Sequence, residues 1–432
     1  MNAALRLAYG AVGQLARTAA ALAPDGGPKW RRSLAARRGI RGRYAAWSRN
    51  RDLSRPLLWL HAPSVGEGLQ ARVVIEHVRQ KRPDIQLAYT FFSPSAESFA
   101  RTLPVDFSDY LPFDTPGDAA AVLNALRPTA LVFSKLDVWP LLVEQAAERG
   151  VRLGLVSGTV SDASSREGLV ATALLHESYA SLDLVGAASD ADAQRIISLG
   201  ADPARVRVTG DTRYDQVWRR ARNTDLRSAV LAPLVSTRPT LVAGSTWPAD
   251  EEVLLAAWPE VKRDIPDARL VIAPHEPTPA HLSPIEAWAH GHGFALGRLG
   301  SENASRADVV LVDRTGVLGE LYALATVAFV GGGFHGAGLH SVLEPAAFGV
   351  PVAFGPRHSN SREAVLLHRS RGGDSVATID ETIEALQVWL ADSAARERAG
   401  AAAGALVERG LGAGERSYEL VMELMFDGER SG

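Results

Sequence analysis

The chain contains no cysteine among its 432 residues, and its formal net charge is only -3. Without thiols it can form no disulfide, bind no zinc through thiolates and use no cysteine nucleophile. The absence of cysteine fits a reducing compartment. A nearly balanced charge argues against a general nucleic-acid-binding protein, although the basic residues gather near the N-terminus.

The sequence also lacks an uninterrupted apolar run at its N-terminus. Arg6 and Arg17 break the first 24 residues, so a helix lying on a membrane surface is favoured over a transmembrane span. A helical wheel gives one face with Leu5, Tyr9, Val12, Leu15 and Ala19, and a neighbouring face with Arg6, Gly10, Gly13 and Arg17. No clear small-residue cleavage site follows, so we do not expect a signal peptide.

A strongly basic segment follows at residues 29–51, with nine basic residues, no acidic residue and two tryptophans. This composition suits anionic lipid headgroups or a phosphorylated ligand. The alternative is a solvated, arginine-rich helix without a ligand.

The length of the chain exceeds what one hydrophobic core usually organises, so we expect two domains. From Leu57 onward, short β-rich runs alternate with helical stretches, which predicts a parallel sheet with helices on both faces. The alternation stops in the arginine-rich residues 219–239, where we place a linker, and then resumes. The predicted organisation is an N-terminal membrane-associated helix (1–28), two α/β doubly wound domains (29–220 and 238–414) and a C-terminal helix (415–432) that packs back on the first domain.

The stretch HAPSVGEG, residues 61–68, places Glu67 at a sharp strand-to-helix turn. Ligands of open α/β sheets bind at the carboxyl ends of the strands, so this carboxylate is a candidate general base. A helix N-terminus favours its ionised form, which also makes it a weak base. The alternative is that Glu67 only caps the helix.

The most glycine-dense stretch is VGGGFHGAGLHSVLEPAAFG, residues 330–349, which predicts a strand, a loop and a helix from about His340. Backbone amides at such a loop suit a phosphate or carboxylate. Glu344 would lie one helical turn beyond His340, where a ribose is a natural partner. As a dinucleotide fingerprint the glycine pattern is weak, since no acid ends the next strand. His340 by itself also fits a structural histidine.

Other polar residues follow predicted strands: Ser245 and Thr246, His275 with Glu276, and Lys135 with Asp137. For Ser245 and Thr246, helix capping is an adequate alternative. The sequence has no HExxH metal motif, no calcium-loop continuation and no GxSxG nucleophile elbow.

Together these stretches resemble the family of 3-deoxy-D-manno-octulosonic acid (Kdo) transferases of lipopolysaccharide core biosynthesis. The resemblance runs in the family's order through LWLHAPSVGEG, TFFSPSAESFA, YLPFDTP, FSKLDVWP, VTGDTRYDQV, VAGSTWPADEE, IAPHEPTP and GGGFHGAGLHSVLEPAAFGVPVAFGP. It implies a GT-B fold of two Rossmann-like domains facing across a cleft, with CMP-Kdo as donor and no cofactor or metal. The implied acceptor is the phosphorylated, acylated lipid A precursor, lipid IVA. The implied location is the cytoplasmic face of the bacterial inner membrane, peripheral or monotopic.

By this resemblance, Glu67 is the general base of an inverting transfer that releases CMP. The residues implied to face the acceptor or Kdo are Ser64, Gly66, Lys135, Asp137 and Arg213. Those implied to line the CMP site are Ser245, Thr246, His275, Gly331, Gly332, Gly333, His340 and Glu344. The sequence departs from the family at Asp137, where a glutamate is usual, at Ser341, where an asparagine is usual, and at His275, where many members have arginine.

Two other functions remain open. A UDP-sugar 2-epimerase or another GT-B glycosyltransferase would share the fold and a glutamate after a glycine-rich loop. A non-catalytic GT-B scaffold in a membrane complex is a further alternative.

Overall fold

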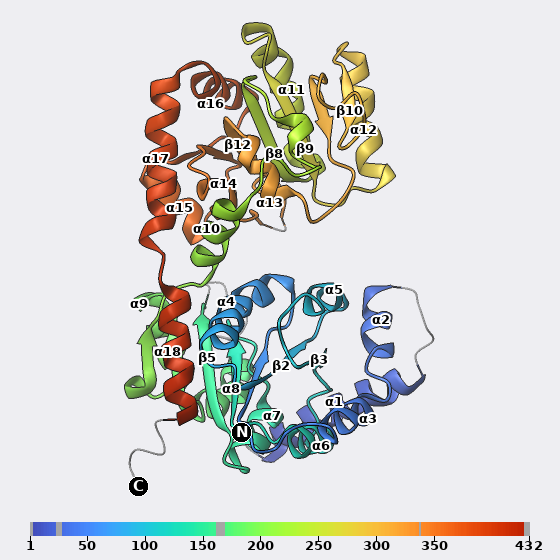
Figure 1. Ribbon diagram of the computed structural model, residues 1–432, viewed down its shortest axis with the longest axis vertical. Helices are drawn as coiled ribbons and strands as arrows, with labels where there is room; N and C mark the ends of the chain where they lie inside the picture. The colour runs from blue at the N-terminus through green and yellow to red at the C-terminus, as the bar shows by residue number, and fades with distance from the viewer. Residues whose placement is uncertain (1–2, 23–27, 161–168, 337, 427–432) are drawn as a thin grey trace. The chain divides into compact units, whose positions relative to one another are not determined.

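The computed structural model describes residues 3–22, 28–160, 169–336 and 338–426. The chain divides into two compact units, Met1–Gln216 with Gly412–Gly432, and Val217–Leu411. Each unit contains its own seven-stranded, fully parallel sheet with helices packed around it (Figure 1). The predicted α/β class with two doubly wound domains is therefore confirmed.

The sheet of the first unit has the strand order β3-β2-β1-β4-β5-β6-β7. Its strands are β1 (Leu57–His61), β2 (Gln86–Phe91), β3 (Phe107–Tyr110), β4 (Ala130–Ser134), β5 (Arg152–Gly158), β6 (Leu184–Ala187) and β7 (Val206–Val208). The chain reverses its direction of progress across the sheet between the neighbours β1 and β4, whose register pairs His61 with Phe133. The carboxyl ends of the neighbouring strands β1 and β4 are therefore the topological switch point of the unit.

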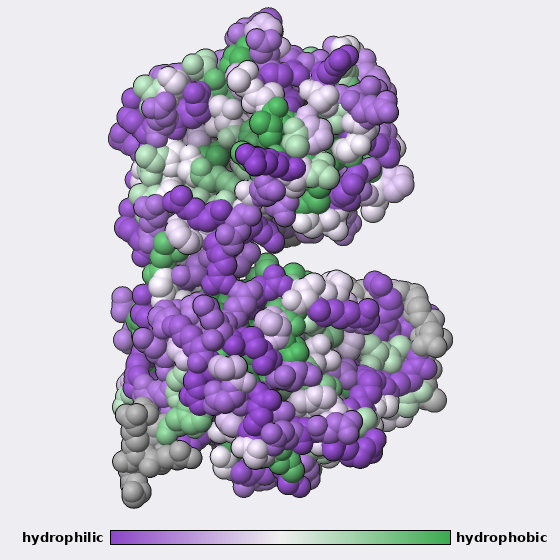
Figure 2. Space-filling view, viewed as in Figure 1, coloured by the Kyte–Doolittle hydropathy of each residue, from purple (hydrophilic) through white to green (hydrophobic). Residues whose placement is uncertain are grey.

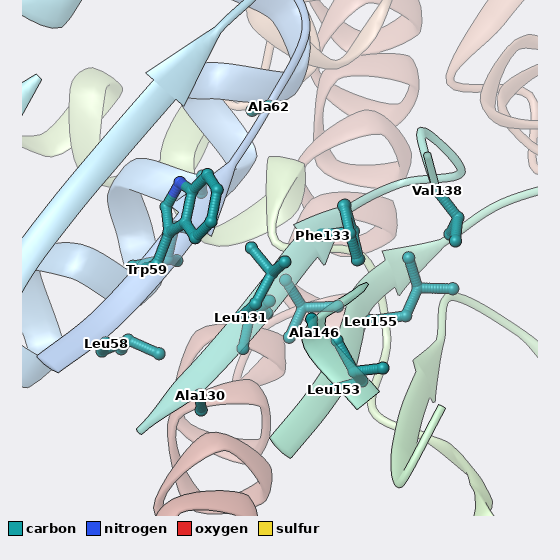
Figure 3. Packing of buried hydrophobic residues seen from close by; sticks show 14 of the residues in the cluster. Leu58, Trp59, Ala62, Ala130, Leu131, Phe133, Val138, Ala146, Leu153 and Leu155 are labelled. Carbon is teal, nitrogen blue, oxygen red and sulfur yellow. The ribbon is translucent and has the colours of Figure 1, made fainter. Parts of the chain in front are cut away.

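The core of the first unit explains why these segments form central strands. All five residues of β1 are buried, as expected for a parallel strand covered on both faces. Figure 3 shows Trp59 of β1 with Leu131 and Phe133 of β4 and Leu155 of β5 inside one cluster of buried side chains. The uninterrupted apolar runs in the sequence therefore correspond to the centre of the sheet.

Helices of the first unit cover both faces of this sheet. They are α1 (Ala3–Leu22), α2 (Lys29–Ala35), α3 (Ile40–Ser48), α4 (Val65–Lys81), α5 (Glu97–Ala100), α6 (Pro116–Leu126), α7 (Pro140–Ala147), α8 (Leu169–Ala180), α9 (Asp190–Ser198) and α18 (Ala413–Phe426). Helix α10 (Arg213–Asn223) begins in this unit and ends in the second. The last helix, α18, contacts α4 and β5. Its start is held by Asp215, whose carboxylate accepts from the backbone N–H groups of Gly412 (2.8 Å) and Gly414 (2.9 Å).

The second unit has the strand order β10-β11-β9-β8-β12-β13-β14. Its strands are β8 (Thr240–Thr246), β9 (Arg269–Pro274), β10 (Leu296–Arg298), β11 (Val309–Leu311), β12 (Val327–Val330), β13 (Val352–Phe354) and β14 (Gly373–Ser375). Its helices are α11 (Pro248–Asp264), α12 (Pro279–Gly291), α13 (Leu318–Leu321), α14 (Leu343–Ala346), α15 (Arg362–Arg369), α16 (Ile379–Ala391) and α17 (Ser393–Arg409). Here the chain reverses its progress between β8 and β12, which pair Gly244 with Val330.

Strand β14 ends at Ser375, and Thr378 caps α16 by accepting from the backbone N–H of Glu381. One local prediction differs from the structure. The helix expected from about His340 is the short α14, so His340 lies in a loop and does not share a helical face with Glu344. Pro345 lies in the first turn of α14, where proline is tolerated, and Gly349 just beyond the helix has a left-handed φ of 69°.

Helix α1 packs on the first unit through its polar and glycine face. Arg6 bonds to Glu144 at 2.7 Å, and a Cβ added to Gly13 would lie 2.9 Å from the carbonyl oxygen of Asp114. Tyr9, expected on the apolar face, instead donates its hydroxyl hydrogen to the Asp114 carboxylate. The outward face carries Leu7, Val12 and Leu15, which are 74%, 66% and 71% exposed. Because the glycines permit close approach, the polar face turns inward and the apolar face outward.

The basic segment is also partly absorbed into the fold. Arg37 is buried and donates to the carbonyl oxygens of Leu111 (2.8 Å) and Phe92 (3.0 Å). Arg41 pairs with Asp118 at 2.5 Å, and Arg43 pairs with Asp109 at 2.6 Å. These three arginines therefore hold α2 and α3 on the unit, which corrects the expectation that the whole segment faces a ligand. Within the described residues, no helix is both long and apolar enough to cross a bilayer.

Candidate active site

Polar side chains gather at the switch point of each sheet. In the first unit, Ser64 and Glu67 follow β1, and Lys135 and Asp137 follow β4. In the second unit, the segment after β8 and the glycine loop after β12 (Gly331 to Gly336) occupy the equivalent place. Because ligands of open α/β sheets bind at this position, each unit presents one candidate site.

Glu67 is held by two partners from different segments. One carboxylate oxygen accepts from the hydroxyl of Ser64, and the other accepts from the ammonium of Lys135 at 3.1 Å. The Glu67 side chain is 18% exposed, so it lies largely under the surface while remaining accessible. The structure therefore brings together Glu67, Ser64 and Lys135, as the sequence motifs suggested.

The local sequence explains how Glu67 reaches this place. Ser64 is the N-cap of α4 and accepts from the backbone N–H of Gly66 at 3.3 Å. A Cβ on Gly68 would lie 2.5 Å from the ring of Phe99, so this glycine lets the first turn of α4 pack closely. Lys135 has a left-handed φ of 69°, a strained conformation for a residue with a side chain.

The pKa of Glu67 lies below its usual value. Burial would raise the pKa, but the hydrogen bond from Ser64 and the charge of Lys135 outweigh burial and lower it. Glu67 is thus an ionised, acceptor-only carboxylate at neutral pH. It does not make a reciprocal capping box, because its two carboxylate oxygens accept from the Ser64 hydroxyl and from Lys135. Capping alone therefore does not account for its two contacts.

A buried network behind this site was missed from the sequence. His61 is fully buried at the end of β1, and its Nδ1 lies 3.0 Å from the hydroxyl of Thr90. The indole N–H of Trp139 is within reach of both His61 Nε2 (3.2 Å) and Asp137 Oδ2 (3.1 Å). This network fixes the direction of the Asp137 side chain. The sequence offered one sign of this network, because His61 is the first residue of the HAPSVGEG stretch.

Arg213 lies at the start of α10 and pairs with a buried carboxylate. Its guanidinium pairs with Asp211 at 2.6 Å, and Asp211 also accepts from the amide of Gln70 on α4 at 3.0 Å. Burial would raise the pKa of Asp211, but the Arg213 charge and hydrogen bonds lower it. Arg213 is thus tied to the same helix that carries Glu67.

In the second unit, Asp250 holds the glycine loop in place, a role that sequence reasoning missed. Its fully buried carboxylate accepts from the backbone N–H groups of Gly332 (2.7 Å), Phe334 (3.0 Å) and Trp247 (2.9 Å). A Cβ on Gly331 would lie 2.3 Å from the carbonyl oxygen of Ser245, so only glycine fits there. The loop is therefore preorganised by α11 and by the end of β8.

Aromatic rings from three strand ends meet beside this loop. Trp247 stacks on His275 and on His335, with ring centroids 4.6 and 4.5 Å apart, and His275 lies 4.6 Å from His340. Burial, with the nearby His275, lowers the pKa of His340 to about 4. His340 is therefore neutral at physiological pH. Trp247 and His335 were not predicted as site residues.

The remaining predicted residues of the second unit surround this cluster. Ser245 has a left-handed φ of 54°, and the hydroxyl of Thr246 donates to Glu251 at 2.7 Å. Glu344 lies at the start of α14, with its Oε1 3.4 Å from Nη1 of Arg220. Burial raises the pKa of Glu344, and the charge of Arg220 offsets this only in part. The described residues contain no group of three or more histidine or acidic side chains arranged to hold a metal ion.

Two Rossmann-like units, each with ligand-type residues at its switch point, define a protein of the GT-B class. Solved structures of other proteins are similar to this chain in fold. A UDP-GlcNAc 2-epimerase from Neisseria meningitidis bound to UDP-GlcNAc matches with a TM-score of 0.63 and 13% identity, over 86% of this chain and all of that chain. At this identity the match concerns the fold alone.

Sequence comparisons show which proteins this chain is similar to. The family model described as 3-deoxy-D-manno-octulosonic-acid transferase matches residues 34–216. A 3-deoxy-D-manno-octulosonic acid transferase of Haemophilus influenzae is 26% identical over 91% of this chain and 92% of its own length. One from Chlamydia muridarum is 29% identical over 82% of this chain and 81% of its own. The chain is therefore similar to Kdo transferases, the family that its motifs resemble.

Proposed function

We propose that this protein is an inverting glycosyltransferase that moves Kdo from CMP-Kdo to the lipid A precursor lipid IVA during lipopolysaccharide core biosynthesis. The observation that carries the proposal is the ionised Glu67 at the β1/β4 switch point, held by Ser64 and Lys135. The similarity to Kdo transferases supports Kdo as the sugar that is transferred.

In this reaction Glu67 is the general base. Its carboxylate takes the proton from the acceptor hydroxyl while that oxygen attacks the anomeric carbon of Kdo. The bond from that carbon to the CMP phosphate oxygen breaks, and CMP leaves with the bonding electrons. The residues that would then face the acceptor or Kdo lie around the same switch point or on segments tied to α4. They are Ser64, Gly66, Lys135, Asp137 and Arg213.

The second unit would hold the donor. The neutral imidazole of His340 is a suitable donor to the phosphate and to the leaving CMP, as are those backbone N–H groups of the glycine loop that do not donate within the protein. Glu344 would accept from ribose hydroxyls, and Ser245, Thr246 and His275 line the same strand ends. Such fixed dipoles stabilise developing negative charge, so the transfer would need neither a metal nor a cofactor.

Membrane association would bring enzyme and acceptor together. The outward face of α1 presents Leu7, Val12 and Leu15, and exposed Trp30 and Arg32 follow on α2. Apolar insertion combined with basic side chains suits the anionic cytoplasmic face of the bacterial inner membrane. Figure 2 shows that hydrophilic side chains cover most of the face in view and that apolar ones form only small groups there.

Vesicle flotation tests this association. Replacing Leu7, Val12 and Leu15 by serine should abolish binding to vesicles that contain anionic lipid. A matched control replaces Val208 and Val235, which are 45% and 52% exposed elsewhere, and should bind like the parent. Equal binding of both variants would show that α1 is not the membrane contact.

The reaction is tested by incubating the protein with CMP-Kdo and tetraacylated lipid IVA and following the lipid by mass spectrometry. The parent should add Kdo and release CMP, whereas Glu67→Gln should bind CMP with unchanged affinity and transfer nothing. Transfer by the variant at the parental rate would remove Glu67 from the role of base. A control with UDP-GlcNAc tests the alternative that the protein is an epimerase. Epimerisation of UDP-GlcNAc by the parent, without any transfer of Kdo, would overturn the proposal.

A further inference from the structure

Helix α10 carries an arginine that reaches the predicted ribose carboxylate. The boundary between the two units falls within this helix, between Gln216 and Val217, and Arg220 lies in its second half. Nη1 of Arg220 lies 3.4 Å from Oε1 of Glu344. The side chains are 35% and 24% exposed, so the pair is partly shielded from water.

The neighbouring helix α13 is built to admit this arginine. A Cβ added to Gly319 would lie 2.2 Å from Nη1 and 3.0 Å from Cδ of Arg220. Any side chain at position 319 would therefore displace the guanidinium. The absence of a Cβ here is what allows Arg220 to reach Glu344.

Few other groups act on Glu344. Tyr322, just after α13, is fully buried and is close enough for the Glu344 charge to raise its pKa further. Helix α17, which also contacts α14, approaches this part of the chain with Gly400 and Gly404, whose nearest neighbours are atoms of Gly349. Within the part of the chain that the structure describes, Arg220 is the one cation whose charge lowers the pKa of Glu344 against the effect of burial.

We propose that Arg220 is a positioning residue for the donor nucleotide, which keeps Glu344 ionised so that the carboxylate can accept hydrogen bonds from both ribose hydroxyls. The inference rests on the proposed function, in which Glu344 meets the ribose. A protonated carboxyl group would offer a donor in place of one acceptor and would recognise the two hydroxyls less well. Because Arg220 lies on α10, donor binding acts directly on the helix within which the unit boundary falls.

The test measures CMP affinity by calorimetry between pH 6 and pH 9. Removing the cation raises the pKa of Glu344, so Arg220→Gln should bind CMP about tenfold more weakly than the parent near pH 6. Its affinity should recover toward the parental value at pH 9, where Glu344 ionises again. Arg220→Lys should behave like the parent. Gly319→Ala, which leaves Arg220 in the chain but displaces it, should reproduce the pH-dependent loss.

Two further measurements separate this role from simple structural support. Glu344→Gln should bind CMP weakly at every pH, without recovery. With 2′-deoxycytidine monophosphate, which lacks one hydroxyl, the difference between parent and Arg220→Gln should shrink. Equal loss at all pH values in Arg220→Gln, or no loss, would overturn the inference while leaving the proposed function intact. A third outcome is that the parent binds UMP and not CMP, and that the UMP affinity of Arg220→Gln recovers at pH 9. In that case the assignment of CMP-Kdo as donor fails, and the role of Arg220 holds. Binding of neither nucleotide to the parent would overturn both.

Discussion

The indole N–H of Trp247 donates a hydrogen bond to Nε2 of His340, 3.3 Å away. An Nε2 that accepts cannot carry a proton, so the neutral imidazole holds its hydrogen on Nδ1. With the pKa of His340 at about 4, this neutral form persists at physiological pH. His340 is therefore a hydrogen-bond donor through Nδ1 and is not a general acid for the leaving group.

Trp247→Phe should release this tautomer lock while keeping an aromatic ring beside His275 and His335. We expect two-bond proton–nitrogen correlation spectra of ¹⁵N-histidine-labelled protein to show His340 with its proton on Nδ1 in the parent and a mixture of tautomers in the variant. CMP affinity should fall about threefold to tenfold, as for one lost neutral hydrogen bond. His340→Gln identifies the resonance. A parental His340 that is protonated at pH 6 would contradict this account.

Lys135→Met should change the pH dependence of transfer. Because Lys135 lowers the pKa of Glu67, its loss leaves burial opposed mainly by Ser64, and the pKa must rise. A general base works only when deprotonated, so the acidic limb of kcat/KM should move upward by about one pH unit. Lys135→Arg keeps the charge, so the acidic limb of its kcat/KM profile should stay at the parental pH. A uniform loss of rate with an unmoved limb would mean that Lys135 acts on substrate alone.

Asp114→Asn should remove one pH-dependent contribution to the free energy of unfolding. Burial raises the pKa of Asp114 to about 6, although the hydroxyl of Tyr9 and the backbone N–H groups of Leu141 and Leu142 donate to it. The folded carboxyl holds its proton to about pH 6, whereas the unfolded one releases it near 3.8.

Unfolding therefore releases the proton of Asp114 in this range, and the contribution of this carboxyl group to stability falls as pH rises from about 4 to above 6. Relative to Asp114→Asn, the free energy of unfolding of the parent should fall by about 3 kcal/mol across this window. Urea titrations at pH 4 and pH 7.5 measure the difference. A constant difference would show that Asp114 ionises normally in the folded state.

Gly331→Ala should damage the donor site more than Gly336→Ala does. At Gly331 the new methyl group meets backbone atoms of Ser245 and Thr246 at 2.3 to 2.6 Å, so the loop or β8 must shift. At Gly336 the nearest atom is Nη1 of Arg357 at 3.9 Å, an ordinary contact. We expect a loss of about 2 kcal/mol or more of stability, with weakened CMP binding, for the first variant alone. Thermal unfolding and calorimetry check both, and equal behaviour of the two would refute a requirement for glycine at 331.

Much of the architecture could be predicted from periodicity. Buried runs such as Leu57–His61 and Ala130–Ser134 are apolar along their length because both faces of a parallel strand are covered. Periodicity identifies the edge strands β3 and β10 poorly, because they have only four and three residues of mixed polarity. The length of α14 was overestimated because helical periodicity does not register how the preceding loop is held.

Parts of the candidate site were also readable, because Ser64, Glu67 and Lys135 follow strands whose neighbours in the sheet could be inferred. The partners of Glu344 and His340 were not. Arg220 lies 124 positions before Glu344, and Trp247 lies 93 before His340, and no local pattern relates such distant positions. Asp250 likewise looks like a residue in an acid-rich helix start until the glycine loop folds onto it.

The sequence alone determined the alternation of strands and helices, the strand ends that carry polar residues and the glycines that only a close backbone approach requires. These depend on local periodicity and on backbone conformation, which short segments encode. Only the tertiary structure decided the charge states and orientations: an ionised Glu67 beside Lys135, a neutral His340 beneath Trp247, and an α1 whose polar face turns inward. Those properties depend on burial and on which distant groups come within about 4 Å, because electrostatic and hydrogen-bond energies act through space and not along the chain.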